Sequence, residues 1–140
     1  MAEFNFYVPI DVRYGDLDPQ WHVNNSRYLT YMEQARLSYM QNLGFFDGKS
    51  FLDYRLIIAD THVSYKAPIE LGRSVRVGTR TQKIGTKSIT FEYTVEDETG
   101  GQVFATGEVV CVFYNYHMHA TEPIPADWRR KFSEFEGRDF

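Results

Sequence analysis

Residues 25–43, NSRYLTYMEQARLSYMQNL, carry the one long helical pattern of the chain. Their large side chains recur at spacings of three and four residues, which predicts an amphipathic helix. The recurring positions are Tyr28, Met32, Ala35, Tyr39 and Leu43. Asn24 or Asn25 is suited to cap the start of this helix, and Gly44 to end it in a left-handed conformation. The apolar face is broad, so we expect other elements to cover the helix on several sides.

Extended segments flank this helix on both sides. Residues 5–13 predict a first strand, and Pro9 favours an edge position for it. Four more segments after residue 51 are rich in β-branched and aromatic residues, with a hairpin turn at 84–86 and Gly107 as a bulge. These predicted strands are 55–66, 74–84, 86–97 and 102–116. A short surface helix is expected at 125–136.

The order of these elements predicts a single α+β domain over residues 1–140. An antiparallel sheet has one face to bury and the long helix has apolar sides to bury, so the sheet is expected to curl around the helix. The length fits one domain, and the sequence shows no linker or internal repeat. The absence of repeated strand–helix–strand units argues against a nucleotide-binding parallel sheet.

Composition excludes several classes of function. The net charge is −4, from 15 basic and 19 acidic residues, which argues against bulk binding to nucleic acid or anionic membrane. The single cysteine, Cys111, excludes an internal disulfide framework and a Cys-rich zinc module, and we expect it to pack in the core. No apolar run is long enough for a membrane helix, and the N-terminus lacks a signal-peptide pattern. We therefore expect a cytoplasmic protein that does not insert into membranes.

Positive charge is concentrated in residues 73–87, RSVRVGTRTQKIGTK, which hold five basic and no acidic residues. Two interpretations stay open: a solvated strand face, or a local binding site for a small polyanion such as a phosphorylated cofactor tail.

Residues 13–36, RYGDLDPQWHVNNSRYLTYMEQAR, resemble the acyl-CoA thioesterase branch of the hot-dog fold, the 4-hydroxybenzoyl-CoA thioesterase-like family. The resemblance lies in Asp16-x-Asp18, the Val23-Asn24-Asn25 stretch, Tyr28-x-x-Tyr31 and Glu33-x-Ala35-Arg36. It extends over roughly residues 8–131 and implies a hot-dog fold, with a curved antiparallel sheet wrapped around one central helix.

This resemblance implies hydrolysis of an acyl-CoA thioester to free acid and CoA. Asp18 corresponds to the nucleophile or general base, and the backbone amide near Asn25 to the donor that polarises the carbonyl. The physical chemistry agrees, because a helix N-terminus presents unpaired amides to a developing oxyanion. The loop is also similar to that of acyl-ACP thioesterases, which implies a catalytic or orienting role for His22, the alternative being a brace for the loop. In that comparison Gln20 replaces an asparagine and Trp21 replaces a small or polar residue. Two roles stay open for Trp21, a wall of the acyl pocket or a buttress.

The resemblance also implies where the substrate lies. Candidate contacts for the coenzyme phosphates are Arg73, Arg76, Lys83, Lys87 and Ser88, and candidate neighbours of the acyl group are Trp21, Tyr28, Tyr31, Met32 and Tyr39. CoA is then part of the substrate, and neither a further cofactor nor a metal is expected. Hot-dog proteins place their sites in clefts between subunits, so a homodimer or homotetramer is expected.

Rival assignments have simpler explanations. Asp16 is expected to hydrogen-bond loop amides. Glu33, a rival carboxylate, is expected to pair with Arg36. His117 and His119 alternate like strand neighbours but lack a third ligand for a metal.

Alternative functions are an acyl-ACP thioesterase and a non-hydrolytic acyl-CoA or acyl-ACP binding module. A dehydratase or hydratase of the same fold is a third, although its His and acid arrangement is not found in the sequence.

Overall fold

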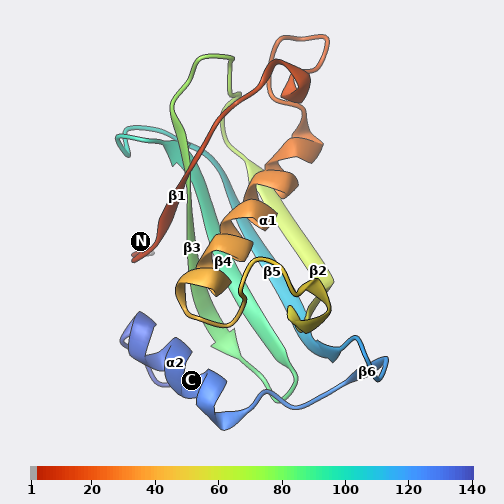
Figure 1. The fold of residues 1–140 in the computed structure, drawn as a ribbon. Helices are drawn as coiled ribbons and strands as arrows, with labels where there is room; N and C mark the ends of the chain where they lie inside the picture. The colour runs from red at the N-terminus through yellow and green to blue at the C-terminus, as the bar shows by residue number, and fades with distance from the viewer. Residues whose placement is uncertain (1–2) are drawn as a thin grey trace.

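The computed structural model describes residues 3–140 and contains an antiparallel sheet curled around a long helix (Figure 1). The strands are β1 (Tyr7–Ile10), β2 (Leu56–Tyr65), β3 (Val75–Ile84), β4 (Ser88–Asp97), β5 (Val103–Asn115) and β6 (Ala120–Thr121). The helices are α1 (Asn25–Asn42) and α2 (Ala126–Glu136), with short 3₁₀ turns η1 (Tyr14–Asp16) and η2 (Phe51–Asp53). The predicted α+β arrangement is confirmed. No helix in the described part of the chain is long and apolar enough to cross a membrane.

The sheet has the strand order β1-β3-β4-β5-β2, with β6 paired to the end of β5. All pairs are antiparallel, and β3 and β4 form the predicted hairpin. β1 lies at one edge, as Pro9 indicated, although the strand is shorter than the predicted 5–13. β2 forms the other edge.

Gly107 does not form the predicted bulge. It pairs in regular register with Val63 and Tyr93, and the register shifts fall elsewhere, for example between Ile58 and Asp60. A Cβ at Gly107 would lie 2.6 Å from the Cε atom of Met32. The end of the buried Met32 side chain on α1 therefore occupies the space that a Cβ at this position would take.

We expect Gly107→Ala to destabilise the fold by about 1–3 kcal/mol, because an added methyl group overpacks the contact with Met32. The midpoint of urea unfolding measures this effect. Gly101→Ala is the control, since its Cβ would meet nothing closer than 3.4 Å. Equal midpoints for the two variants would contradict this account of Gly107.

The caps and buried face of α1 agree with the sequence prediction. The side chain of Asn24 accepts a hydrogen bond from the Ser26 amide at 3.0 Å, and Gly44 follows the helix with a φ of 83°. The buried positions on α1 are Tyr28, Tyr31, Met32, Ala35, Arg36, Tyr39 and Met40.

The predicted ion pair between Glu33 and Arg36 is wrong. Glu33 is exposed, whereas Arg36 turns into the core and its Nη1 donates to the Tyr93 hydroxyl at 2.9 Å. Its Nε has no hydrogen-bond partner among the described residues. The i, i+3 spacing favours pairing only on an exposed face, and Arg36 lies on the face that α1 buries against the sheet.

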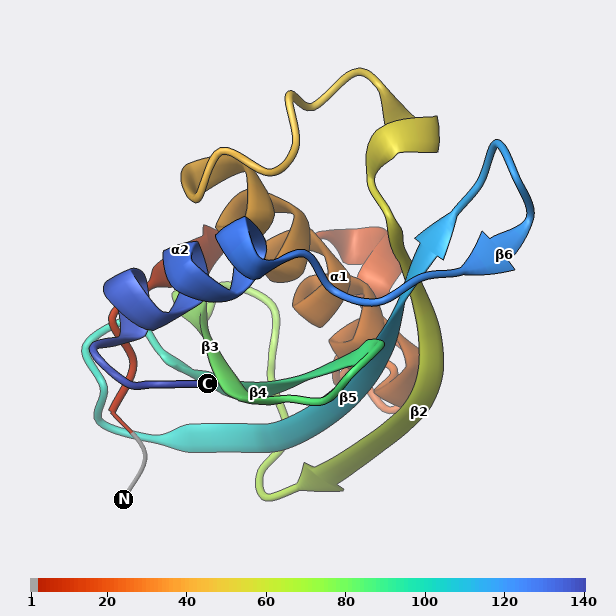
Figure 2. The same cartoon turned by 90° about the horizontal axis from the view of Figure 1, so that it is seen from below.

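The C-terminal helix is more deeply anchored than a surface helix. α2 lies beside α1 on the concave side of the sheet (Figure 2). Phe132 is completely buried and stacks on Tyr39 with ring centroids 6.3 Å apart. Glu136 accepts hydrogen bonds from the Tyr39 hydroxyl at 2.5 Å and from the Thr81 amide at 2.9 Å. α2 therefore closes the end of the core that α1 leaves open.

Candidate active site

A narrow turn places Asp18 beside the start of α1. Leu17 pairs with Val23, and the Asp18 amide donates to the His22 carbonyl at 2.9 Å. The Val23 amide donates to the Ile69 carbonyl at 2.8 Å, which ties the turn to the segment after β2. Seven residues of sequence are folded back on themselves, so Asp18 and the first residue of α1 become neighbours.

Asp16 holds this turn in place, in agreement with the predicted structural role. Its carboxylate is buried and accepts hydrogen bonds from the Tyr31 hydroxyl at 2.7 Å and the Arg13 amide at 3.0 Å. Its backbone carbonyl accepts from the Asn24 amide at 2.8 Å. Burial, with the neighbouring Asp16 carboxylate, raises the pKa of Tyr31. The phenol of Tyr31 therefore stays protonated and donates to Asp16, and this hydrogen bond connects the turn to α1.

A hollow of about 540 Å³, which we call the inner hollow, lies between this turn, α1 and the end of β2. Asp18, His22 and Asn25, the three candidate catalytic residues, all line it. Gln20 and Tyr28 line it as well, and the segment from Tyr65 to Pro68 forms the opposite wall. One Asp18 oxygen accepts from the Gln20 amide at 2.9 Å, which orients the carboxylate.

The first amide of α1 is available to a ligand. The Asn24 side chain accepts from the Ser26 amide and the Asn24 carbonyl from the Arg27 amide, at 3.0 and 2.9 Å. These bonds leave the Asn25 N–H without an acceptor within residues 3–140, at the partly positive end of the helix. The inner hollow is thus lined by a carboxylate, that of Asp18, and by the residue that carries this free backbone donor.

Tyr65 and Lys66 are site residues that the sequence analysis missed. The Tyr65 hydroxyl donates to the Asn25 carbonyl at 3.0 Å, and its ring meets that of Tyr28 edge-on with centroids 5.0 Å apart. Burial and the nearby Tyr65 raise the pKa of Tyr28. Lys66 is exposed and is the cation that lines the inner hollow. In the sequence both residues lie at the end of a predicted strand. Only Pro68, which ends that strand, marked this position, and it did not indicate a site.

The predicted acyl-group neighbours do not lie together. Tyr28 lines the inner hollow, but Tyr31 and Met32 are at most 5% exposed and do not line it. Tyr39 lies about 16–17 Å beyond Tyr28 along α1, at 1.5 Å per residue, under α2. Trp21 is 67% exposed and lies on the other side of the turn.

The predicted coenzyme contacts form two separate groups. Arg73 and Arg76 lie where β3 begins, and they donate to Asp97 and Glu96 at 3.2 and 2.9 Å. Lys83, Lys87 and Ser88 lie at the β3–β4 hairpin, the far end of a strand about 30 Å long. The two groups therefore do not form one phosphate site within a protomer.

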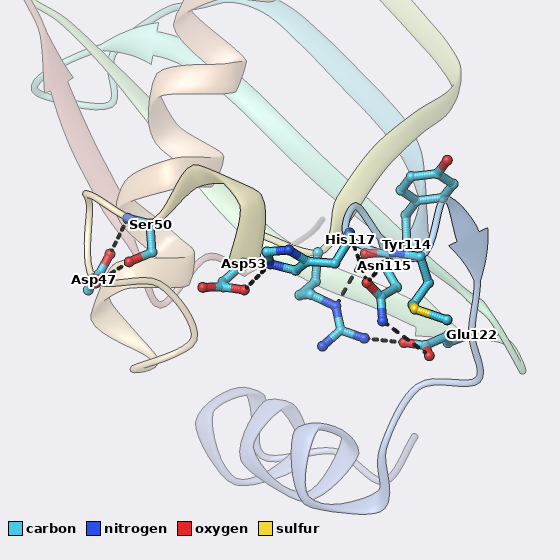
Figure 3. Close-up of polar contacts among 9 residues, drawn as sticks. Asp47, Ser50, Asp53, Tyr114, Asn115, His117 and Glu122 are labelled. Atoms are coloured by element: carbon cyan, nitrogen blue, oxygen red, sulfur yellow. Dashed lines mark hydrogen bonds and ion pairs between the residues drawn. The ribbon is translucent and has the colours of Figure 1, made fainter.

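The histidines near the end of β5 are not strand neighbours as predicted. Residues 116–119 form a turn, and His119 has a φ of 52°. His117 turns toward Asp53, with its Nε2 3.1 Å from the carboxylate, while Asn115 approaches Glu122 (Figure 3). No group of three His, Cys, Asp or Glu residues within residues 3–140 is arranged to hold a metal ion.

Cys111 is completely buried, as expected for a packing residue, and burial raises the pKa of its thiol.

Comparisons with known proteins agree with the fold. The family model of the thioesterase-like superfamily matches residues 12–132. A thioesterase from Thermus thermophilus, solved with coenzyme A and zinc, superposes with a TM-score of 0.86 and 36% identity over 99% of each chain. A predicted thioesterase from Bacillus stearothermophilus superposes with a TM-score of 0.84 and 31% identity, over 93% of this chain and 95% of that one. The long-chain acyl-CoA thioesterase FadM of Escherichia coli K12 is 25% identical over 89% of this chain and 95% of its own length.

The fold and these similarities together define a thioesterase of the hot-dog fold. The chain belongs to the thioesterase-like superfamily.

Proposed function

We propose that this protein hydrolyses acyl-CoA thioesters to the free acid and CoA at the inner hollow. The observation that carries the proposal is that a carboxylate, Asp18, and the free amide of Asn25 line the same hollow. A thioester carbonyl bound there has an attacking group near its carbon and a donor near its oxygen. FadM of Escherichia coli, a relative along nearly its whole length, is named as a long-chain acyl-CoA thioesterase.

The Asn25 amide acts on the negative charge that develops on the carbonyl oxygen during attack. Asp18 acts by one of two routes. It attacks the carbonyl carbon, so that the CoA thiolate leaves and water hydrolyses the mixed anhydride. Alternatively, it removes a proton from a water molecule that attacks the carbon directly. His22, which lines the same hollow, orients the substrate or this water.

The coenzyme arm is expected to contact Lys66, the cation of the inner hollow. Of the five coenzyme contacts suggested by the sequence, Arg73 and Arg76 lie at the same end of β3 as the segment that leads from Lys66. Lys83, Lys87 and Ser88 contact the same CoA only if a second subunit brings them to the site.

Asn25→Pro tests the oxyanion role directly. Proline is tolerated at the first position of a helix, where the missing N–H has no intrahelical partner. Asn24 already has the extended conformation, with φ −60° and ψ 140°, that a following proline requires. We expect kcat for an accepted acyl-CoA to fall by about 10²–10³-fold with little loss of stability.

Asn25→Ala is the matched control, because it keeps the amide N–H and removes only the side chain. It should retain kcat within a few-fold. Equal kcat for the proline and alanine variants, with both folded by circular dichroism, would disprove the oxyanion role of this amide.

We also infer that two copies pair through β2. This ten-residue strand is an open edge of the sheet, and it exposes Ile57 and Ile58 by 42% and 47%. A long open edge offers unpaired backbone groups to another strand, and a twofold axis pairs it with its own copy.

Light scattering after gel filtration is expected to give twice the chain mass of 16.4 kDa for a dimer, or four times that mass for a tetramer. Ile58→Lys should shift the measured mass toward that of a monomer, because it places a charge from each subunit at the pairing edge. Val103→Lys, at an exposed apolar residue outside β2, should not. A wild-type protein of one chain mass would refute the pairing.

A further inference from the structure

Trp21 occupies a backbone position that suits glycine. The turn from Asp18 is closed by a hydrogen bond from the Trp21 amide to the Asp18 carbonyl at 3.0 Å, and Trp21 has a φ of 64°. In short hairpin turns of this kind the last residue adopts the left-handed conformation, which glycine reaches without steric cost. A tryptophan there strains the backbone.

Packing within the chain does not offset this strain. The Trp21 side chain is 67% exposed, whereas Trp128 stacks on Phe45 with ring centroids 4.1 Å apart. Strained residues of this kind cluster at functional sites, and an observed outlier is a reason to look for a ligand.

A second hollow lies beside this ring, and we call it the outer hollow. Its volume is about 380 Å³, and its lining residues are Tyr14, Gly15, Leu17, Asp18, Pro19 and Trp21. Tyr14 is 72% exposed, so two aromatic rings flank the hollow without being used in the core. Apart from Asp18, its side chains offer rings and alkyl groups.

Asp18 is the one residue that lines both hollows. A thioester whose carbonyl carbon lies at Asp18 extends in two directions, toward its acyl group and toward its coenzyme arm. The inner hollow presents Gln20, His22 and Lys66, which suit the amides and phosphates of the arm. The outer hollow presents an apolar surface, which suits the acyl group.

We propose that the outer hollow binds the acyl group against Trp21 and so sets the acyl specificity of the enzyme. This inference rests on the proposed acyl-CoA hydrolysis. At about 30 Å³ for each water-sized atom, the hollow holds roughly a dozen heavy atoms. The acyl group that fits is therefore an aromatic or medium-chain one. Tyr31, Met32 and Tyr39 are too closely packed to accept it.

Trp21→Gly tests this assignment, because it removes the ring and relieves the backbone strain together. We expect KM for benzoyl-CoA and octanoyl-CoA to rise about tenfold, while acetyl-CoA hydrolysis changes less than twofold. The melting temperature should not fall. Met118→Ala, at an equally exposed apolar side chain far from the turn, is the control and should change none of these values.

A second measurement reports on the ring itself. Binding of a non-hydrolysable octyl-CoA thioether should blue-shift the tryptophan emission of the wild type, and this shift should be absent in Trp21→Gly. If the wild type hydrolyses the panel but Trp21→Gly keeps the same acyl preference and the same spectral shift, this inference falls and the proposed function stands. If the wild type hydrolyses no acyl-CoA, the proposed function falls and takes this inference with it.

Discussion

Asp18→Asn is expected to lower kcat/KM for an accepted acyl-CoA by about 10³-fold or more, within the range that general-base or nucleophilic groups contribute. The amide has the size of the carboxylate and can still accept the hydrogen bond that the Gln20 amide donates at 2.9 Å. It cannot attack a carbonyl carbon or remove a proton from water. The turn should therefore keep its shape while the chemical step is lost.

The measurement is steady-state hydrolysis over a panel of acyl-CoA thioesters, with the Kd of a thioether analogue measured alongside. Asp11→Asn, an exposed carboxylate outside the turn, is the control and should keep full activity. An intact Kd with lost turnover supports the role of Asp18. Undiminished turnover in both Asp18→Asn and Asp18→Ala would refute it, and a wild type that binds but never hydrolyses would favour the binding-module alternative.

Phe132→Ala is expected to destabilise the protein by about 3–5 kcal/mol, the usual effect of removing a buried phenylalanine. Phe132 is completely buried, and its ring lies 4.8 Å from that of Phe45 and 6.3 Å from that of Tyr39. Its loss leaves a cavity between α2 and α1 that no neighbouring side chain fills without moving. The melting temperature should fall by roughly 10–20 °C.

Glu134→Ala is the matched control, because Glu134 lies on the same helix and is exposed. It should change the free energy of unfolding by no more than about 0.5 kcal/mol. At a temperature where Phe132→Ala is still folded, its kcat should be near that of the wild type, because α2 is far from the inner hollow. Similar melting temperatures for the two variants would mean that α2 contributes little to the core.

Local patterns predicted the elements well. The helix from Asn25, its caps and the β3–β4 hairpin were readable because short-range spacing, capping and turn chemistry specify them. The prediction of a bulge at Gly107 was wrong. This glycine packs against Met32, a residue 75 positions earlier in the chain. The prediction was wrong again for Arg36, because i, i+3 spacing does not tell which side of a helix is buried.

The same distinction holds for the candidate site: residues close in sequence could be predicted, and residues brought together by the fold could not. Asp18, His22 and Asn25 could be predicted together because they lie within eight residues of one another in a turn that leads into a helix. Tyr65 and Lys66 were not found, because they reach the site only when β2 folds back beside α1. The five predicted coenzyme contacts lie within sixteen residues of one another in the sequence, but an extended strand places its two ends far apart.

By itself, the sequence determined the α+β class, the long helix and the acidic turn before it, because all of these depend on residues within a few positions of each other. The tertiary structure alone decided which side chains share a hollow, that Phe132 is part of the core, and that Asp18 lies between a polar and an apolar hollow. These features depend on contacts between distant segments, which form only when the curled sheet closes on α1. The left-handed backbone of Trp21 belongs with them, because a positive φ is a property of the closed turn and not of the tryptophan.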